Sequence, residues 1–349
     1  MINSLLRPIV EFLGSVSQSE KNCGKLVERH YPHWDKTDPI QCEYLQKLEE
    51  FVDKNKGEKP LAVFDWDGTL YSEKIQVKEY AGAGTKAGQP AWHIWAAYHM
   101  NDDKNLNLLP MFRTAEPHDE RVRNAVIKDD YLEGQLDQKP EGYDKFSQIA
   151  IFEAGMTPLE VARAVQIYTA DYDVCEHPIY PSMDVAQRLV DAGFKVWIVT
   201  GSNPHYVAAV LEVVQKDCSF KKDRKYELNI SSTPYSAEKD RIVGNMAKLL
   251  ENGTFSMVYD DSFTRKGGDG KLLIIEKDGK RVALQHYIEP KENAKAIFCA
   301  GNSGGDFHIM RHILSDEHSF GLFVNPRGGL EKLAEEFAER AVKIFFQEK

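Results

Sequence analysis

A short apolar segment, Leu61–Phe64, runs directly into the acidic segment Asp65–Thr69, whose sequence is Asp-Trp-Asp-Gly-Thr. Four consecutive apolar residues predict a buried strand, and the glycine indicates a tight turn after it. Two carboxylates at the carboxyl end of a buried strand stand where open α/β sheets bind their ligands. Like charges this close together are costly unless a cation or a shared proton relieves them. We therefore expect a metal-dependent site at this junction.

Two further apolar segments, Val196–Thr200 and Ala296–Ala300, also end in clusters of small and polar residues. Continuous apolar strands that alternate with amphipathic helices predict a parallel sheet, so the expected fold class is α/β with a Rossmann-like core. The other expected elements are helices at Met183–Ala192, from Ser202 or Asn203 through Val214, and at Asp306–Leu314, a late strand at Leu322–Val324, and a small β addition formed by Tyr226–Ser232 and Leu272–Glu276.

About 130 residues separate the first two expected strands, which is far more than a βαβ crossover needs. We therefore predict an N-terminal helical extension (1–59), a discontinuous core (60–70 and 181–349) and a helical cap inserted at 71–180. The expected cap helices are Gln89–Met100, His118–Val126, Tyr143–Ala154 and Pro158–Tyr168.

Composition narrows the class of protein. The chain has 54 acidic and 44 basic residues, and the basic ones form no single stripe, which argues against a nucleic-acid partner. No stretch approaches the length of a membrane span. The five cysteines are odd in number and form no Cys-x-x-Cys pair, so we expect reduced thiols and a cytoplasmic location.

Taken together, these features resemble the haloacid dehalogenase superfamily of phosphohydrolases. The segment Asp65–Thr69 is similar to the first motif of that family, and Thr200, at the end of its strand, is similar to the second. A lysine at the start of the helix before the last motif strand is the third motif. The segment Gly301–Asp306, Gly-Asn-Ser-Gly-Gly-Asp, is similar to the fourth.

The resemblance implies a covalent mechanism. Asp65 would attack phosphorus and form an aspartyl-phosphate, while Asp67 would protonate the leaving alcohol and then deprotonate water. Magnesium would be held by the Asp65 carboxylate, the Asp67 carbonyl oxygen and the Asp306 carboxylate.

The resemblance also implies a phosphoryl-binding site. The Thr200 hydroxyl and the backbone N–H groups of Trp66, Asp67 and Gly201 would bind phosphoryl oxygens. Asn302 stands where many relatives carry an aspartate. Its amide can still hydrogen-bond a metal-bound water or the motif lysine, but it carries no charge.

Several lysines compete for the third motif. Lys280 follows a glycine and precedes the helical run Val282–Ile288, so it can point from a helix N-terminus toward the phosphate. Lys291 and Lys295 lie in the polar loop before the last motif strand, and Lys266 lies in a glycine-rich turn. We predict Lys280.

The cap position resembles the phosphoserine-phosphatase-like branch, and the layout resembles bacterial phosphorylcholine phosphatases. The aromatic residues Trp66, Trp92, Trp95 and Tyr98 are compatible with a quaternary ammonium substrate, because such groups bind aromatic faces. For Trp92, Trp95 and His99, which stand at helical spacing, packing of the cap is the preferred interpretation.

The leading hypothesis is a magnesium-dependent phosphomonoesterase that acts on a small phosphorylated metabolite. A phosphotransferase or phosphomutase would use the same intermediate with a different acceptor. A binding or effector protein that keeps the fold and has little turnover is the third alternative. The sequence leaves the oligomeric state open.

Overall fold

The computed structural model describes residues 23–72, 92, 153, 155–171, 174–218, 226–230, 241–259 and 274–345. Six strands form one sheet in the order β3-β2-β1-β6-β7-β8, and every neighbouring pair is parallel. The strands are β1 (Leu61–Phe64), β2 (Lys195–Val199), β3 (Ile242–Val243), β6 (Ala296–Gly301), β7 (Phe320–Val324) and β8 (Ala341–Ile344). The three strands expected at Leu61, Val196 and Ala296 are confirmed, as is the late strand.

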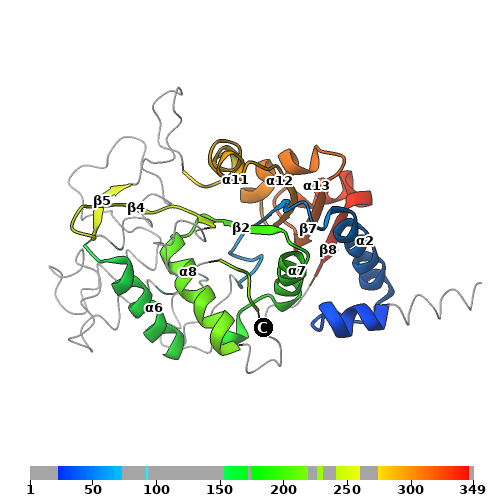
Figure 1. Ribbon diagram of the computed structural model, residues 1–349, viewed down its shortest axis with the longest axis horizontal. Coiled ribbons are helices and arrows are strands. Elements are labelled where there is room, and N and C mark those ends of the chain that lie inside the picture. The colour runs from blue at the N-terminus through cyan, green and yellow to red at the C-terminus, as the bar shows by residue number, and fades with distance from the viewer. Residues whose placement is uncertain are drawn as a thin grey trace, which may run out of the picture.

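The strands are largely apolar because both faces of the sheet are covered. Ala62 and Phe64 of β1 belong to one hydrophobic cluster, whereas Leu61 and Val63 belong to a second cluster on the opposite face. In Figure 1, α2 and α7 lie on one side of the sheet, and α11, α12 and α13 lie on the other. The core is therefore a three-layer α/β arrangement, which confirms the expected fold class.

The helices follow the predicted pattern closely. The expected helices at Met183, Asn203, Asp306 and Val282 are all present, and Asn203 is the N-cap of its helix, with Pro204 in the first turn. The helices are α2 (Pro39–Asn55), α6 (Pro158–Asp171), α7 (Tyr180–Asp191), α8 (Pro204–Val213), α10 (Asp278–Ala283), α11 (Glu289–Glu292), α12 (Phe307–Leu314) and α13 (Leu330–Glu336). Shorter helical turns are η3 (Val174–Glu176), η4 (Val214–Cys218), η5 (Leu284–Ile288), η6 (Gly304–Asp306) and η7 (Ala338–Arg340).

The chain leaves the core and returns to it at one point. Tyr71 forms an antiparallel bridge with Pro178, and the Ser72 N–H donates to the His177 carbonyl oxygen at 2.8 Å. The two ends of the long insertion are therefore side by side, as an inserted domain requires. Within the insertion, α6 contains the expected helix at Pro158 and packs against α8 of the core. The three other expected cap helices lie outside the described residues, apart from Trp92 and Glu153.

The expected β addition is wrong where the structure describes it. Residues 226–230 and 274–276 form no strand, and an antiparallel pair is made instead by β4 (Ala247–Leu249) and β5 (Phe255–Tyr259). Phe255 of β5 exchanges backbone hydrogen bonds with Gly155 and Met156, so this pair is anchored to the segment that precedes α6.

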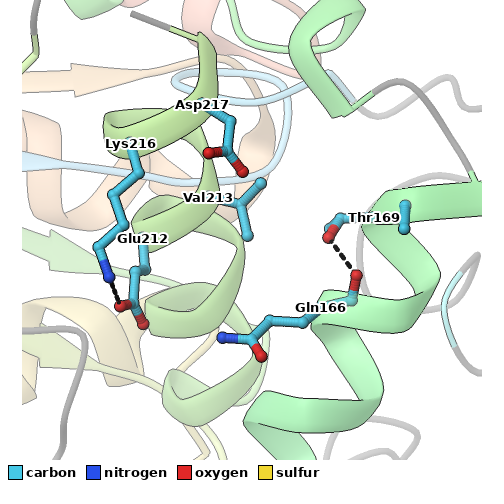
Figure 2. A pocket seen from close by; sticks show the side chains of 7 residues that line it. Gln166, Thr169, Glu212, Val213, Lys216 and Asp217 are labelled. Carbon is cyan, nitrogen blue, oxygen red and sulfur yellow. Dashed lines mark hydrogen bonds and ion pairs between the residues drawn. The ribbon is translucent and has the colours of Figure 1, made fainter.

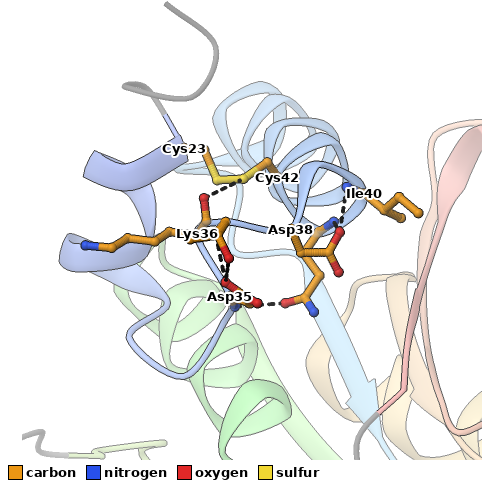
Figure 3. Close-up of a disulfide and its surroundings, with 8 residues drawn as sticks. Cys23, Asp35, Lys36, Asp38, Ile40 and Cys42 are labelled. Atoms are coloured by element: carbon orange, nitrogen blue, oxygen red, sulfur yellow. Dashed lines mark hydrogen bonds between the residues drawn. A yellow bond between two sulfur atoms is a disulfide. The ribbon is translucent and has the colours of Figure 1, made fainter. Parts of the chain in front are cut away.

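The prediction of reduced cysteines is also wrong. Cys23 is bonded to Cys42, Cys175 is bonded to Cys218, and only Cys299 is a free thiol, buried in β6. Figure 3 shows the first disulfide, which joins the helical segment 23–30 to α2. The loops that the two bonds close span 19 and 43 residues. Chain entropy assigns them roughly 3 and 4 kcal/mol of stabilisation.

The disulfides remove the basis of the expected cytoplasmic location, because such bonds persist mainly in oxidising compartments. Across the described ranges, no helix is both long and apolar enough to span a bilayer.

Candidate active site

The site lies at the carboxyl edge of the parallel sheet. In the order β3-β2-β1-β6-β7-β8, the strands β2 and β3 are added on one side of β1, and β6, β7 and β8 are added on the other. In open α/β sheets a ligand crevice forms at such a switch point, here between β1 and β6. Asp65 follows β1, and Asn302 and Asp306 follow β6, so the topology brings the first and fourth motifs together there. Thr200 follows β2, the neighbour of β1 on the other side.

Lys280 lies between the two carboxylates. Its Nζ is 2.7 Å from Asp65 Oδ1 and 2.7 Å from Asp306 Oδ1. The exposed fractions of the three residues are 3%, 7% and 1% respectively, so the ion pairs are shielded from water. Lys280 reaches this point from the first turn of α10, the helix N-terminus that the sequence predicts.

The other lysines are placed elsewhere. Lys291 is exposed and its ammonium lies 5.1 Å from the ring centroid of Trp197. Lys295 is exposed just before β6, and Lys266 lies outside the described residues. Within the described part of the chain, Lys280 is therefore the lysine that meets the acidic pair.

Burial and charge act on this cluster in opposite directions. Burial raises the pKa of Asp65 well above its usual value, the charge of Asp306 raises it further, and Lys280 opposes both. Burial alone would lower the pKa of Lys280, but Asp306 and Asp65 outweigh it and raise that pKa. When both carboxyl groups are ionised, one ammonium neutralises only one of them, and the cluster then carries an excess negative charge.

Asp306 is further held by the loop that it closes. Its Oδ2 accepts the backbone N–H groups of Asn302 at 3.1 Å and of Ser303 at 3.2 Å. The expected amide Asn302 is buried beside it, and the carbonyl oxygen of Asn302 accepts the N–H of Arg327 at 3.0 Å. The loop therefore fixes the carboxylate by its backbone.

Asp67 meets a different set of partners. Ser202 Oγ donates to Asp67 Oδ2 at 2.6 Å, and Thr200 Oγ1 is 3.5 Å from the same oxygen. The turn that follows the two aspartates contains Gly68, whose φ of 73° lies in the left-handed region that glycine favours. Asp65 meets the ammonium of Lys280 and, at 3.4 Å, the hydroxyl of Thr69, whereas Asp67 meets hydroxyl groups.

Ser202 is a site residue that the sequence pattern did not indicate. In the pattern Ser202 is only a possible helix cap, and the cap is Asn203, whose side chain accepts the His205 N–H at 2.8 Å. Asn203 also donates to the buried carboxylate of Glu153 at 3.0 Å, which ties the loop after β2 to the end of the insertion. The available signal was a second hydroxyl residue two positions after Thr200.

Aromatic rings surround the Asp67 turn. Trp66 stacks on Tyr71 with ring centroids 5.2 Å apart, and Trp92 stacks on Tyr206 at 5.5 Å. Burial is the main cause that raises the pKa of Tyr71 and of Tyr206, and the charge of Asp67 adds to both. Trp95 and Tyr98 lie outside the described residues. Of the predicted tryptophans, the two that are described are therefore buried in stacked pairs.

A pocket of about 200 Å³ lies away from this chemistry, between the ends of α6 and α8. Figure 2 shows its polar lining, in which Lys216 pairs with Glu212. The first α8 residue of the lining, Glu212, lies eight residues after the start of the helix at Pro204, at about 1.5 Å per residue. It is therefore distinct from the edge that carries Asp65 and Lys280.

The sheet order and the polar groups at its carboxyl edge define a doubly wound α/β protein with a candidate catalytic site. A family model for haloacid dehalogenase-like hydrolases matches residues 60–264, which is more than half of the 349 residues, and the chain belongs to this family. The matched range includes Asp65, Asp67 and Thr200 and ends before Lys280 and Asp306. No curated protein matches the sequence.

Three solved structures are similar to the chain over most of its length. A protein of unknown function from Bordetella pertussis Tohama I has a TM-score of 0.46 and 14% identity, over 81% of this chain and 97% of that chain. A functionally unknown protein from Anaerococcus prevotii DSM 20548 has a TM-score of 0.49 and 16% identity, over 87% and 91%. A cytosolic 5'-nucleotidase IIIB bound to cytidine has a TM-score of 0.40 and 11% identity, over 88% and 86%.

Proposed function

We propose that the protein is a phosphomonoesterase that acts through an aspartyl-phosphate on Asp65. The observation that carries this proposal is the different environment of two aspartates in one turn. Asp65 is buried against Lys280, whereas Asp67 is held by the hydroxyl of Ser202. Two carboxylates in such different settings suit different roles in one reaction.

In the first half of the reaction, a carboxylate oxygen of Asp65 attacks phosphorus as the bond to the alcohol oxygen breaks. Asp67 gives its proton to that oxygen, so the alcohol leaves neutral. In the second half, Asp67 takes a proton from water, and the water oxygen attacks phosphorus and releases Asp65 and inorganic phosphate. Thr200, the N–H groups of Trp66, Asp67 and Gly201, and the N-terminus of α8 are the proposed partners of the phosphoryl oxygens.

Lys280 would keep the Asp65 carboxylate oriented and partly neutralise the incoming phosphate. Its position between Asp65 and Asp306 supports its assignment as the motif lysine. Asn302 lies next to these groups and is the proposed partner of a bound water or of Lys280.

The residues at this edge fit a magnesium ion. In the described ranges no group of three or more His, Cys, Asp or Glu side chains is placed to hold a metal. The proposed set needs only two such side chains, Asp65 and Asp306, together with the carbonyl oxygen of Asp67. These are the oxygen ligands that Mg²⁺ prefers, and the excess negative charge of the pair favours a cation. When bound, the ion would stabilise charge on the transferred phosphoryl group.

Residues 71–180 are the proposed cap, and a phosphocholine-like substrate is the proposed substrate class. The adjacency of Tyr71 and Pro178 supports an insertion that enters and leaves beside the site. The substrate class rests on the aromatic residues of the sequence, because quaternary ammonium groups bind aromatic faces. The described rings of Trp66, Tyr71 and Tyr206 are themselves buried in stacked pairs.

The proposal is tested by measuring phosphate release from p-nitrophenyl phosphate with and without Mg²⁺. We expect magnesium-dependent turnover that Asp65→Asn lowers by at least about 10³-fold, because the nucleophile is lost. Thermal unfolding is the control, and we expect Asp65→Asn to fold, since it removes a carboxylate whose charge burial disfavours. Turnover that survives Asp65→Asn would contradict the nucleophile assignment.

The same assay separates the alternatives. A screen of phosphocholine, phosphoethanolamine, phosphoserine, phosphotyrosine and sugar phosphates is expected to show the highest kcat/KM for phosphocholine. Equal values for phosphocholine and phosphoethanolamine would contradict the aromatic recognition. If added acceptor alcohols receive most of the phosphoryl group, the protein is a phosphotransferase. Absence of turnover with every substrate would favour a binding or effector protein.

A further inference from the structure

We propose that Ser202 is a positioning residue for Asp67, and that it holds the carboxyl group in line with the leaving oxygen. The inference rests on the proposed phosphatase function and adds a residue that none of the four motifs contains. Its starting point is the 2.6 Å hydrogen bond from Ser202 Oγ to Asp67 Oδ2.

Ser202 is the closer of the two hydroxyl groups near Asp67. Thr200 Oγ1 is 3.5 Å from Asp67 Oδ2, and it also accepts the backbone N–H of Ser202 at 3.0 Å. A hydrogen bond from a hydroxyl to a carboxylate is charge-assisted, and 2.6 Å is the short distance expected for it. Ser202 therefore supplies the directional contact, which leaves the Thr200 hydroxyl near the place proposed for the phosphoryl group.

The backbone of Ser202 is fixed from the side of β3. Asn245 donates its N–H to the Ser202 carbonyl oxygen at 3.2 Å and its side-chain amide to the Gly201 carbonyl oxygen at 2.8 Å. The Asn245 Oδ1 accepts the Ile275 N–H at 2.8 Å, so Asn245 is itself held in place. A Cβ on Gly244 would lie 2.2 Å from the Ser202 carbonyl oxygen, so this close approach requires glycine.

The next residue fixes the loop from the side of the insertion. Asn203 is fully buried, caps α8 and donates to Glu153. Ser202 is thus a serine of 6% exposure whose backbone is tied down on both sides. A hydroxyl on such a rigid support can hold Asp67 in one orientation, as efficient proton transfer requires.

This role makes a prediction that depends on the leaving group. A simple alkyl alcohol needs a proton in order to leave, whereas p-nitrophenolate leaves readily without one. Loss of a group that aims Asp67 should therefore slow alkyl phosphates much more than p-nitrophenyl phosphate. A residue that only binds the phosphoryl group would affect both substrates equally, since that group is common to them.

The experiment compares wild type with Ser202→Ala on phosphocholine, or the best alkyl phosphate of the screen, and on p-nitrophenyl phosphate. The quantity compared is kcat/KM, because it reports the steps through release of the alcohol and leaves out hydrolysis of the aspartyl-phosphate, which is common to both substrates. We expect kcat/KM to fall roughly 10- to 100-fold for the alkyl phosphate and only about 2- to 3-fold for the aryl phosphate. Ser202→Thr, which keeps the hydroxyl, should restore most of the alkyl activity. Ser202→Cys, with its weaker S–H donor, should give an intermediate value and serves if Ser202→Ala does not fold.

Two further variants isolate the role. Ser182→Ala is the matched control, because Ser182 is a fully buried serine in α7 whose Oγ has no partner within the described residues. It should leave both rates unchanged. In an Asp67→Asn background, Ser202→Ala should cause no further loss, because the residue through which it acts is absent.

The outcomes distinguish this inference from the function on which it rests. Equal losses of kcat/KM on both substrates, or a full additional loss in the Asp67→Asn background, would overturn the role of Ser202 while the phosphatase remains. Wild-type protein that releases phosphate from no substrate would overturn both proposals.

Discussion

Asp306 and Asp184 are both buried aspartates, but they are balanced in different ways. Asp306 shares the single ammonium of Lys280 with Asp65. Asp184, in α7, accepts the backbone N–H of His33 at 3.0 Å and the hydroxyl of Tyr226 at 2.8 Å. The His33 ring nitrogen Nδ1 lies 3.1 Å from the same carboxylate.

The difference separates a structural cluster from a candidate catalytic one. Around Asp184, donors from two distant parts of the chain, His33 and Tyr226, bind one carboxylate, and the cluster joins the N-terminal extension to the core. Around Lys280, two carboxylates face one cation at the switch point of the sheet. A buried cluster of unbalanced charges lowers the stability of the fold. Such clusters are typical of functional sites, where a charged ligand can balance them.

The largest effect is expected from removing the shared cation. Lys280→Met keeps the length of the side chain but leaves two buried carboxylates facing each other. We expect a loss of roughly 3–5 kcal/mol in the free energy of unfolding, together with loss of phosphate release. Urea denaturation measures the first effect, and the phosphatase assay measures the second.

Lys195→Met provides the matched control for this change. Lys195 begins β2 and pairs with Glu292, and its side chain is 26% exposed, so its ion pair is partly solvated. We expect it to lose no more than about 1 kcal/mol. Equal losses of unfolding free energy in the two lysine variants would contradict the view that Lys280 balances the charge of two buried carboxylates.

A smaller and purely structural effect is expected at Asp184. Asp184→Asn places an amide among groups that already donate, so one hydrogen bond to His33 or Tyr226 is lost. We expect about 1–3 kcal/mol less stability, with kcat unchanged at a temperature where the variant is folded. A fall in kcat without a fall in stability would contradict the structural assignment of this cluster.

Sequence patterns predicted what is local and repeated. Apolar runs that end in polar residues gave the strands before Asp65, Thr200 and Asn302, and the parallel sheet then brings those ends together. The position of Lys280 at a helix start was enough to rank it above Lys291 and Lys295.

Contacts between distant segments could not be predicted in this way. The Cys23–Cys42 and Cys175–Cys218 bonds depend on which helices pack together, and no short cysteine motif marks them. Ser202 and Thr200 are both hydroxyl residues after β2, and only the position of β1 decides which of them reaches Asp67. Asp184 meets His33 and Tyr226 only in the folded chain.

The smallest expected effect is the pH dependence of stability that comes from a buried histidine, His205, which is compared here with His33. His33 lies against Asp184, whereas the Nδ1 atom of buried His205 has no hydrogen-bond partner in the described part of the chain. Burial lowers the pKa of His205 to about 4. The unfolded chain, with an ordinary histidine pKa of about 6.5, therefore binds a proton before the folded chain does as the pH falls. Stability is complete above that ordinary pKa and declines as the pH drops toward the folded-state pKa.

At about pH 5.5 the expected loss from this one group is about 1 kcal/mol relative to neutral pH. His205→Gln should remove it, so wild type and variant should differ in the slope of unfolding free energy against pH in urea titrations between about pH 7 and 5. His33→Gln is the comparison variant, because the His33 ring has a carboxylate partner in Asp184, whereas the Nδ1 atom of His205 has none within the described residues. Parallel slopes for wild type and His205→Gln would show that the His205 ring is solvated, and that burial without a partner does not set its charge.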